Sequence, residues 1–142
     1  MPTWPGRGTI VHFDGGNEYA RVLGSGWLPR AVTGIWSSEK EAWACFKLPV
    51  GSLPISIDVS LSAIGYKPVN VDIDAQQVDV FENDHLLTTW NVNSNDWGTY
   101  HVVIPASVDV TNGACLKLVM PYAVHQDWIQ FGIQLRSIKV NW

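Results

Sequence analysis

Tryptophans beside polar residues are the part of this sequence best suited to ligand chemistry. The chain has 142 residues and eight of them are tryptophan. Four lie in segments typical of loops, namely Trp27, Trp36, Trp97 and Trp128. The flat face of an indole can stack on the apolar C–H face of a sugar ring, and nearby polar groups can hold the hydroxyl groups of that ring. The sequence therefore predicts an aromatic surface for a glycan.

Five polar residues close to these tryptophans are candidates to hold hydroxyl groups or a charged sugar: Arg30, Asn95, Asp96, His125 and Asp127. The alternative interpretation is that the indoles plug the open ends of the fold. Burial of a large apolar side chain is worth about 1.5–3 kcal/mol, so each exposed indole forgoes that stabilisation. For any single tryptophan, a structural role at the end of the fold is the favoured interpretation. It is less favoured as an explanation of all four tryptophans together, which supports the ligand surface.

A second candidate surface lies along one strand. Trp43, Cys45 and Lys47 alternate with apolar residues, which places the three on one face. The lysine indicates that this face points outward, so Trp43 is a candidate for a ligand platform. An ordinary solvated surface, on which the lysine stem covers apolar area, is the favoured interpretation.

Residues for catalysis do not form a convincing set. Asp72-Ile73-Asp74 resembles the short acidic motif of many glycosyltransferases, but the chain is too short for the nucleotide-binding domain that gives this motif its meaning. The histidines are scattered, and no serine or cysteine lies in a nucleophile-elbow pattern. We therefore expect no enzyme activity, no catalytic residue and no metal centre.

Two further questions stay open at this stage. Cys45 and Cys115 can form one disulfide or remain free thiols, and no cysteine–histidine spacing indicates zinc. Structural calcium is a second open point, because sandwich domains often bind one ion. The loop carboxylates that could contribute are Asp14, Glu18, Asp109 and Asp127.

Composition excludes several classes of partner. Charged residues are only 15% of the chain, against about 25% in a typical domain, and the net charge is −4. The basic patches that phosphate backbones require are missing, which argues against nucleic acid. We expect no transmembrane segment, no signal peptide and no direct membrane insertion. A fragment of a larger exported or cell-surface protein fits these features.

The elements that position the candidate residues are strands. Apolar and polar residues alternate over residues 55–62, the pattern of a strand with one buried face. Turn signals separate similar runs, including a hairpin turn at Asn83-Asp84. We predict about eight strands, over residues 8–13, 42–48, 54–64, 76–82, 85–92, 99–104, 114–120 and 131–140.

The expected fold is all-β, an antiparallel, jelly-roll-like β-sandwich. A single domain should cover residues 1–142, with residues 1–7 as a flexible arm. Single helical turns are expected at residues 38–41 and 105–107. A change of phase near Arg136-Ser137 predicts a β-bulge in the last strand, because one extra residue returns the apolar side chains to the core face.

Several segments together resemble the β-sandwich modules found beside bacterial glycosyltransferases and in other cell-surface polysaccharide proteins. The sharper parts are Gly34-Ile35-Trp36-Ser37, the Asn83 turn, and the stretch from Gly132 to Ile138. Two segments depart from the family pattern: Asp84 stands where the turn usually has glycine, and residues 125–130 differ before the last strand. The resemblance covers residues 24–140 and implies a fold like that of carbohydrate-binding modules.

The resulting functional hypothesis is a non-catalytic, lectin-like module that binds a glycan or polysaccharide through aromatic stacking. The alternative is a structural or protein-interaction domain, in which the aromatic residues contact a second copy or a larger surface-polysaccharide protein. Tryptophan and tyrosine are also enriched at protein interfaces, so the sequence leaves this alternative open.

Overall fold

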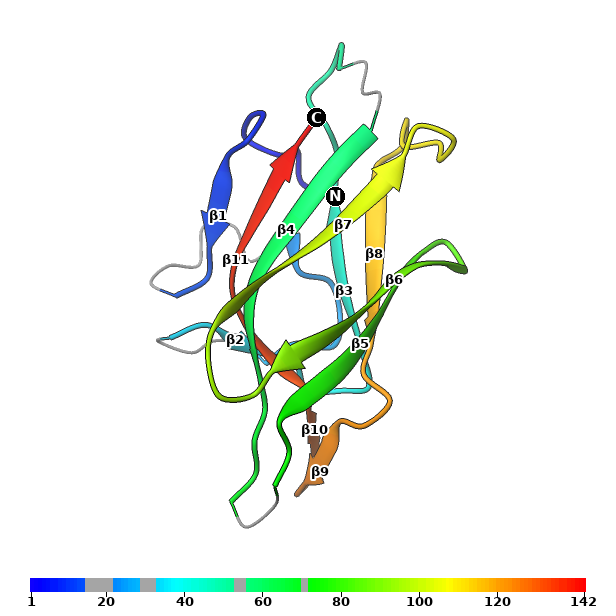
Figure 1. The fold of residues 1–142 in the computed structure, drawn as a ribbon. Coiled ribbons are helices and arrows are strands. Elements are labelled where there is room, and N and C mark those ends of the chain that lie inside the picture. The colour runs from blue at the N-terminus through cyan, green and yellow to red at the C-terminus, as the bar shows by residue number, and fades with distance from the viewer. Residues whose placement is uncertain (15–21, 29–32, 53–55, 70–71) are drawn as a thin grey trace.

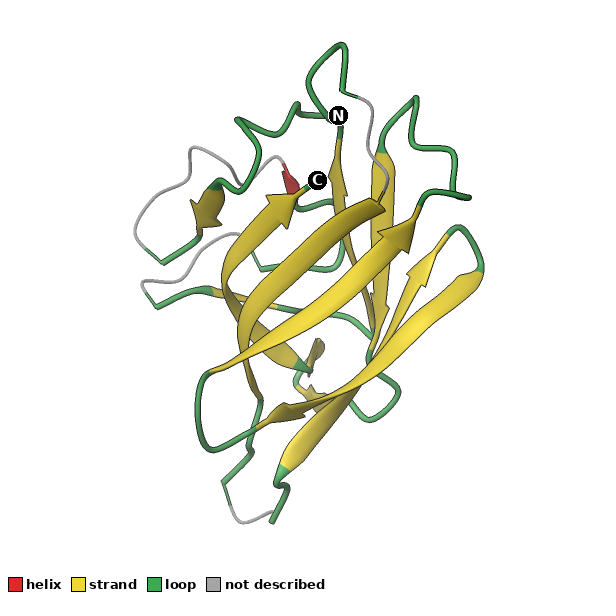
Figure 2. Cartoon of the chain, turned by 45° about the horizontal axis from the view of Figure 1, so that its top comes forward, coloured by secondary structure: helices red, strands yellow, loops and turns green. Residues whose placement is uncertain are grey.

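The computed structural model describes residues 1–14, 22–28, 33–52, 56–69 and 72–142. Two antiparallel sheets face one another (Figures 1 and 2). In the first, the path runs through β1 (Ile10–His12), β11 (Ile133–Asn141), β4 (Ser56–Gly65) and β7 (Gly98–Pro105), and β2 (Ile35–Trp36) also pairs with β11. The second has the order β3 (Glu41–Phe46), β8 (Ala114–Val119), β5 (Ala75–Glu82), β6 (His85–Asn93). A separate hairpin joins β9 (Val124–Gln126) and β10 (Ile129–Phe131).

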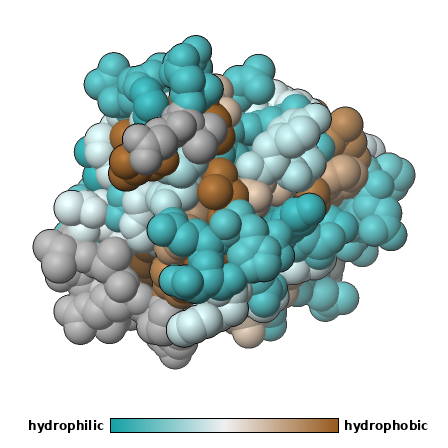
Figure 3. Space-filling model, turned by 90° about the horizontal axis from the view of Figure 1, so that it is seen from below, coloured by the Kyte–Doolittle hydropathy of each residue, from teal (hydrophilic) through white to brown (hydrophobic). Residues whose placement is uncertain are grey.

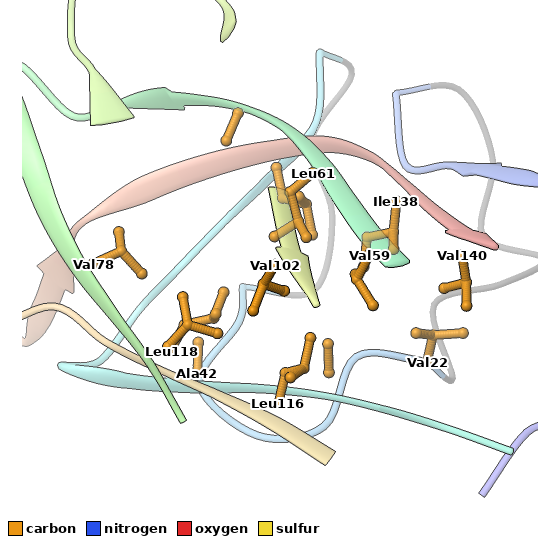
Figure 4. Close-up of a cluster of buried hydrophobic side chains, with 14 of the residues drawn as sticks. Val22, Ala42, Val59, Leu61, Val78, Val102, Leu116, Leu118, Ile138 and Val140 are labelled. Carbon is orange, nitrogen blue, oxygen red and sulfur yellow. The ribbon is translucent and has the colours of Figure 1, made fainter. Parts of the chain in front are cut away.

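Apolar side chains on alternate residues of each strand form the core that joins the two sheets. In β4, Ile57, Val59 and Leu61 are buried, whereas Asp58 between them is exposed. Side chains from both sheets meet in one core, where Val59 and Val102 of the first sheet lie near Leu116 and Leu118 of the second (Figure 4). Because successive residues of a strand point to opposite faces, this pattern fixes which face of each sheet is dry.

Most sequence-based expectations for the fold are confirmed. All eight predicted strands are present within a few residues of their expected bounds, and the register between β11 and β4 shifts at the predicted bulge, between Leu135 and Ser137. Asn83 and Asp84 both have positive φ in a tight hairpin turn, as expected. Short strands β2, β9 and β10 were not predicted. The helical turns expected at residues 38–41 and 105–107 are wrong. The carbonyls of Ser38 and Lys40 accept hydrogen bonds from Gln130 and Met120 of other segments, and residues 105–107 form the end of β7 and a turn.

Residues 1–7 contact the domain at more than one point. Trp4 is 1% exposed, and its ring meets Phe46 edge-on. Its backbone N–H donates to the carbonyl of Lys47, whose own N–H donates to the carbonyl of Pro2. Trp4 is therefore packed into the core, and the flexibility expected for this arm stays a prediction. No helix in the described part of the chain is long and apolar enough to cross a membrane.

Cys45 and Cys115 form a disulfide between neighbouring strands. They face one another directly in the β3–β8 register, with Cα atoms 4.1 Å apart. Both are half-buried on the outer face, as the predicted outward stripe requires. This resolves the question of one disulfide or two thiols, and the link closes a chain separation of 70 residues.

We expect loss of this disulfide to destabilise the domain by about 2–4 kcal/mol, because a long loop of the unfolded chain is no longer constrained. Urea unfolding of the native protein and of the double variant Cys45→Ala/Cys115→Ala measures the difference. Equal stability, together with two titratable thiols in the native protein, would contradict the assignment.

A buried acid gives a pH-dependent prediction. Glu82 is 3% exposed, and burial raises the pKa of its carboxyl, an effect that nearby His85 partly opposes. A folded-state pKa above the unfolded one means that the folded chain holds the proton more tightly, so this group's stabilising contribution is lost as pH rises through that range. We expect Glu82→Gln to raise Tm near pH 7 and to change it little near pH 4. Thermal unfolding at both pH values is the measurement, and an equal change at both would contradict it.

Candidate functional site

The β9–β10 hairpin and the loops around it form one end of the sandwich, which we call the hairpin end. It comprises Trp36, residues 66–69 and 72–74, Asn95, and residues 122–131. This end lies at the bottom of Figure 1, away from both chain termini. Seen from below, apolar patches lie among hydrophilic surface (Figure 3). Several of the predicted ligand residues are brought together here.

Three aromatic rings support the hairpin from behind. Tyr66, directly after β4, stacks on Phe131 of β10 with ring centroids 4.7 Å apart. Trp36 of β2 meets both rings edge-on, at 5.5 Å from Tyr66 and 5.8 Å from Phe131. The Tyr66 hydroxyl also donates a hydrogen bond to Gln126 Oε1 at the end of β9. Stacked and edge-on arrangements are the favourable ones for aromatic pairs, so these contacts hold the hairpin in place.

Ser37 fixes the point where the hairpin enters β11. Its side chain is fully buried, and Oγ accepts hydrogen bonds from the backbone N–H groups of Gly132 at 3.1 Å and Ile133 at 2.9 Å. Its own backbone N–H donates to the carbonyl of Ile133. Buried backbone N–H groups require such partners, so one serine satisfies two of them at a position where the chain changes from hairpin to sheet.

The tip of the hairpin carries three predicted ligand residues. Asp127 has a positive φ of 58°, and its carbonyl is hydrogen-bonded to Nε2 of His125. Trp128, the next residue, is 86% exposed. A rigid indole therefore projects into solvent beside a carboxylate and an imidazole. These groups can stack on a sugar ring and exchange hydrogen bonds with its hydroxyls.

The neighbouring loops bring further polar groups. Lys67 donates to Oδ1 of Asn95 at 2.9 Å, which links the loop after β4 to the loop between β6 and β7. The side chain of Asp96 is exposed in the same loop. The Lys67 hydrogen bond is the contact that joins Asn95 to the rest of the hairpin end.

Two other predicted ligand residues do not contribute to the hairpin end. The indole N–H of Trp27 donates to the carbonyl of Trp43, and Trp27 packs against the core. Trp97 lies under the guanidinium of Arg136, 4.4 Å from the ring centroid. Arg30 lies outside the residues that the structure describes.

The outward stripe of β3 is confirmed, but its aromatic face is occupied. The Lys117 ammonium lies 5.6 Å from the ring centroid of Trp43 and 5.1 Å from that of Phe81. A cation held over a ring by its quadrupole competes with any sugar that would stack there. This agrees with the solvated-surface interpretation that the sequence favours for Trp43.

Sequence reasoning missed Tyr66, Gln126 and Phe131, along with Tyr122, which is 69% exposed beside the hairpin. A signal for the hairpin was present, since Asp tolerates positive φ and apolar residues flank it at Val124 and Ile129. The Tyr66–Phe131 stack had no such signal, because the two residues are far apart in sequence.

The acidic groups do not form a metal site in the described part of the chain, where no three His, Cys, Asp or Glu side chains come together. Of the calcium candidates, Asp14 lies 3.6 Å from His12 after β1, and Asp127 lies on the hairpin. Asp109 accepts hydrogen bonds from Thr111, which lower the pKa of its carboxyl. These three positions are separate, and Glu18 is outside the described residues.

A larger cavity of about 910 Å³ opens at the other end of the sandwich, between the loops after β3 and β7. Its described lining is apolar at Leu48, Ile57 and Ile104 and includes no aromatic ring. The lining also borders residues 53–55, which the structure does not describe, so we assign it no ligand.

Comparison with known proteins shows likeness of fold. The sequence matches no protein-family model and no curated protein. Among solved structures, it is similar to a family 36 carbohydrate-binding module of a multidomain xylanase from the hindgut metagenome of Trinervitermes trinervoides, with 17% identity, TM-score 0.51, and coverage of 94% of this chain and 96% of that one. The C-terminal family 6 module of a marine laminarinase from Zobellia galactanivorans has 11% identity, TM-score 0.50, and coverage of 94% and 100%.

A further family 36 module, solved with calcium and xylotriose, has 11% identity, TM-score 0.48, and coverage of 94% and 99%. At such identities the likeness concerns the fold alone. The all-β sandwich of this chain is the architecture that carbohydrate-binding modules share, as the sequence resemblance implied.

The role assigned to Ser37 gives a stability prediction. Ser37→Ala leaves two buried N–H groups without an acceptor, so we expect a loss of about 1–3 kcal/mol in the free energy of unfolding. Urea unfolding measures this loss. Ser38→Ala is the matched control, since the contacts of Ser38 are made by its backbone. Equal stability of the two variants would remove the anchoring role.

Proposed function

We propose that this chain is a non-catalytic carbohydrate-binding module whose hairpin end holds a glycan, with Trp128 as the stacking surface. The observation that carries the proposal is the contrast among the eight tryptophans, all of which are described. Trp4 and Trp90 are buried. Trp27, Trp36, Trp43, Trp97 and Trp142 each have a hydrogen-bond, aromatic or cationic partner. Within the described structure, Trp128 has none of these and is 86% exposed.

The chemistry follows from the groups around this indole. The apolar face of a sugar ring stacks on Trp128, while the Asp127 carboxylate, Nδ1 of His125 and Nδ2 of Asn95 can exchange hydrogen bonds with its hydroxyl groups. His125 Nε2 and Asn95 Oδ1 already have partners within the chain. The Trp36–Tyr66–Phe131 cluster holds the hairpin before the ligand arrives. Such preorganisation lowers the entropy that binding must overcome. The fold shared with carbohydrate-binding modules supports the same function.

An interaction domain is the second candidate, and one observation favours it. Tyr122, two residues before β9, is exposed like Trp128, and exposed aromatic residues also anchor protein interfaces. The two candidates differ in what Trp128 would contact, a sugar ring or a second polypeptide. Only the second makes the mass of the protein in solution depend on concentration.

We expect Trp128→Ala to weaken glycan binding at least about ten-fold, the loss that a central aromatic anchor typically causes. Isothermal titration with soluble oligosaccharides and pull-down on insoluble polysaccharides measure the affinity, after circular dichroism has shown an intact fold. Trp142→Ala is the matched control, because Trp142 directly follows β11, at the end of that strand far from the hairpin.

Unchanged affinity in Trp128→Ala would remove the hairpin end from the proposal. Silence with every glycan, combined with a mass that rises with concentration and falls back in Trp128→Ala, would instead assign the hairpin end to a protein partner.

A further inference from the structure

One buried polar side chain of the second sheet does not match the apolar core around it. Gln76 of β5 is 1% exposed and lies on the same face of the strand as Val78 and Val80, which are fully buried. The alternation of the strand would place an apolar residue at this position. Burial of an amide costs free energy unless its donors and acceptors are paired, so the glutamine needs another reason than core packing.

Only part of this amide is paired within the described chain. Nε2 of Gln76 donates to the carbonyl of Tyr66 at 3.2 Å, whereas Oε1 is buried and has no hydrogen-bond partner there. Methionine and leucine have a similar volume and no polar atom to satisfy at this position. The amide therefore contributes little to the stability of the core, and the one thing it adds is the contact with Tyr66.

This hydrogen bond crosses from one sheet to the other at the hairpin end. Gln76 belongs to the second sheet, and Tyr66 directly follows β4 of the first. Gly65, the last residue of β4, makes the approach possible. A Cβ atom at this position would lie 2.5 Å from Oγ of Ser94 and 3.2 Å from Cγ of Gln76. The lack of a side chain at residue 65 thus leaves room for the buried polar side chains beside it.

Tyr66 connects this contact to the hairpin. Its backbone N–H donates to the carbonyl of Gly132 at 2.8 Å, so the backbone of Tyr66 is held through both its N–H and its carbonyl. Its ring stacks on Phe131, and its hydroxyl donates to Gln126. These two residues end β10 and β9, the strands that carry Trp128 in the turn between them. A shift of the Tyr66 backbone would therefore disturb both strands of the hairpin.

We propose that Gln76 is a positioning residue of the hairpin end, whose amide holds Tyr66 and, through Tyr66, the hairpin that carries Trp128. Gln76 is too buried to touch a ligand, so it acts on binding only through this contact. The inference rests on the proposed glycan-binding function, to which it adds the residue that couples the core to the binding surface.

Two variants, Gln76→Met and Gln76→Leu, test the proposal, with Gln77→Met as the matched control. Gln77 is the next residue of β5, is only half-buried, and donates its amide N–H to Asp79 instead. Thermal unfolding gives Tm, and isothermal titration of the native protein and the variants with xylotriose and cellotriose gives the affinity. We expect both Gln76 variants to keep or raise Tm, because apolar atoms replace a poorly paired buried amide. They should bind about three- to ten-fold more weakly, as expected when a residue acts through another.

Backbone amide hydrogen exchange without any sugar separates this inference from the proposed function. In both Gln76 variants the amides of the β9–β10 hairpin should exchange about three- to ten-fold faster than in Gln77→Met, while those of β8 keep their rates. If the native protein binds neither sugar, the glycan-binding proposal loses its support, and hydrogen exchange still decides the role of Gln76.

Two results would overturn the proposal. In the first, both Gln76 variants exchange and bind as Gln77→Met does, so that the amide has no effect on the hairpin end. In the second, the affinity falls only together with Tm, or neither Gln76 variant folds, and the amide is then an ordinary part of the core.

Discussion

The register of β11 is the constraint on which the rest of the structure depends. This strand pairs with β4 on one edge and with both β1 and β2 on the other. A strand alternates with period two, so without an extra residue Ile133 and Leu135 could not share the core face with Ile138 and Val140. The bulge between Leu135 and Ser137 supplies that residue, and all four side chains are buried. It also turns Arg136 outward, where its guanidinium binds Ser62 and covers Trp97.

The same strand sets the position of the hairpin end. β10 ends at Phe131, two residues before β11 begins, and Ser37 holds the junction through Gly132 and Ile133. Gly132 also lies against Met120, where a Cβ atom would come within 2.4 Å of the sulfur. The base of the hairpin that carries Trp128 is thus held by contacts of the sheet and the core. Such support is what a binding side chain needs in order to be held in one orientation.

The sequence could predict the sandwich because its strands record their two faces locally. In residues 55–62 and in the phase change at Arg136, neighbouring residues carry the whole signal. The site was harder, because its geometry rests on contacts between distant residues such as Tyr66 with Phe131, and Ser37 with Gly132. Composition could identify tryptophan as the candidate residue type for ligand binding. It could not separate Trp128 from Trp27 and Trp97, whose partners are a carbonyl and a guanidinium supplied by remote segments.

Aromatic residues with a structural role join the edges of the two sheets, in contrast to the exposed Trp128. Strands β6 and β7 are edge strands of different sheets, and an open edge invites pairing with another chain. Here Trp90 of β6 donates its indole N–H to the carbonyl of His101 in β7, and the Tyr100 hydroxyl accepts from the backbone N–H of Asn93. Large polar-tipped aromatics therefore bind the two edges to each other. Trp128 makes no comparable contact within the described chain, and a side chain that contributes so little to the fold is free to serve a ligand.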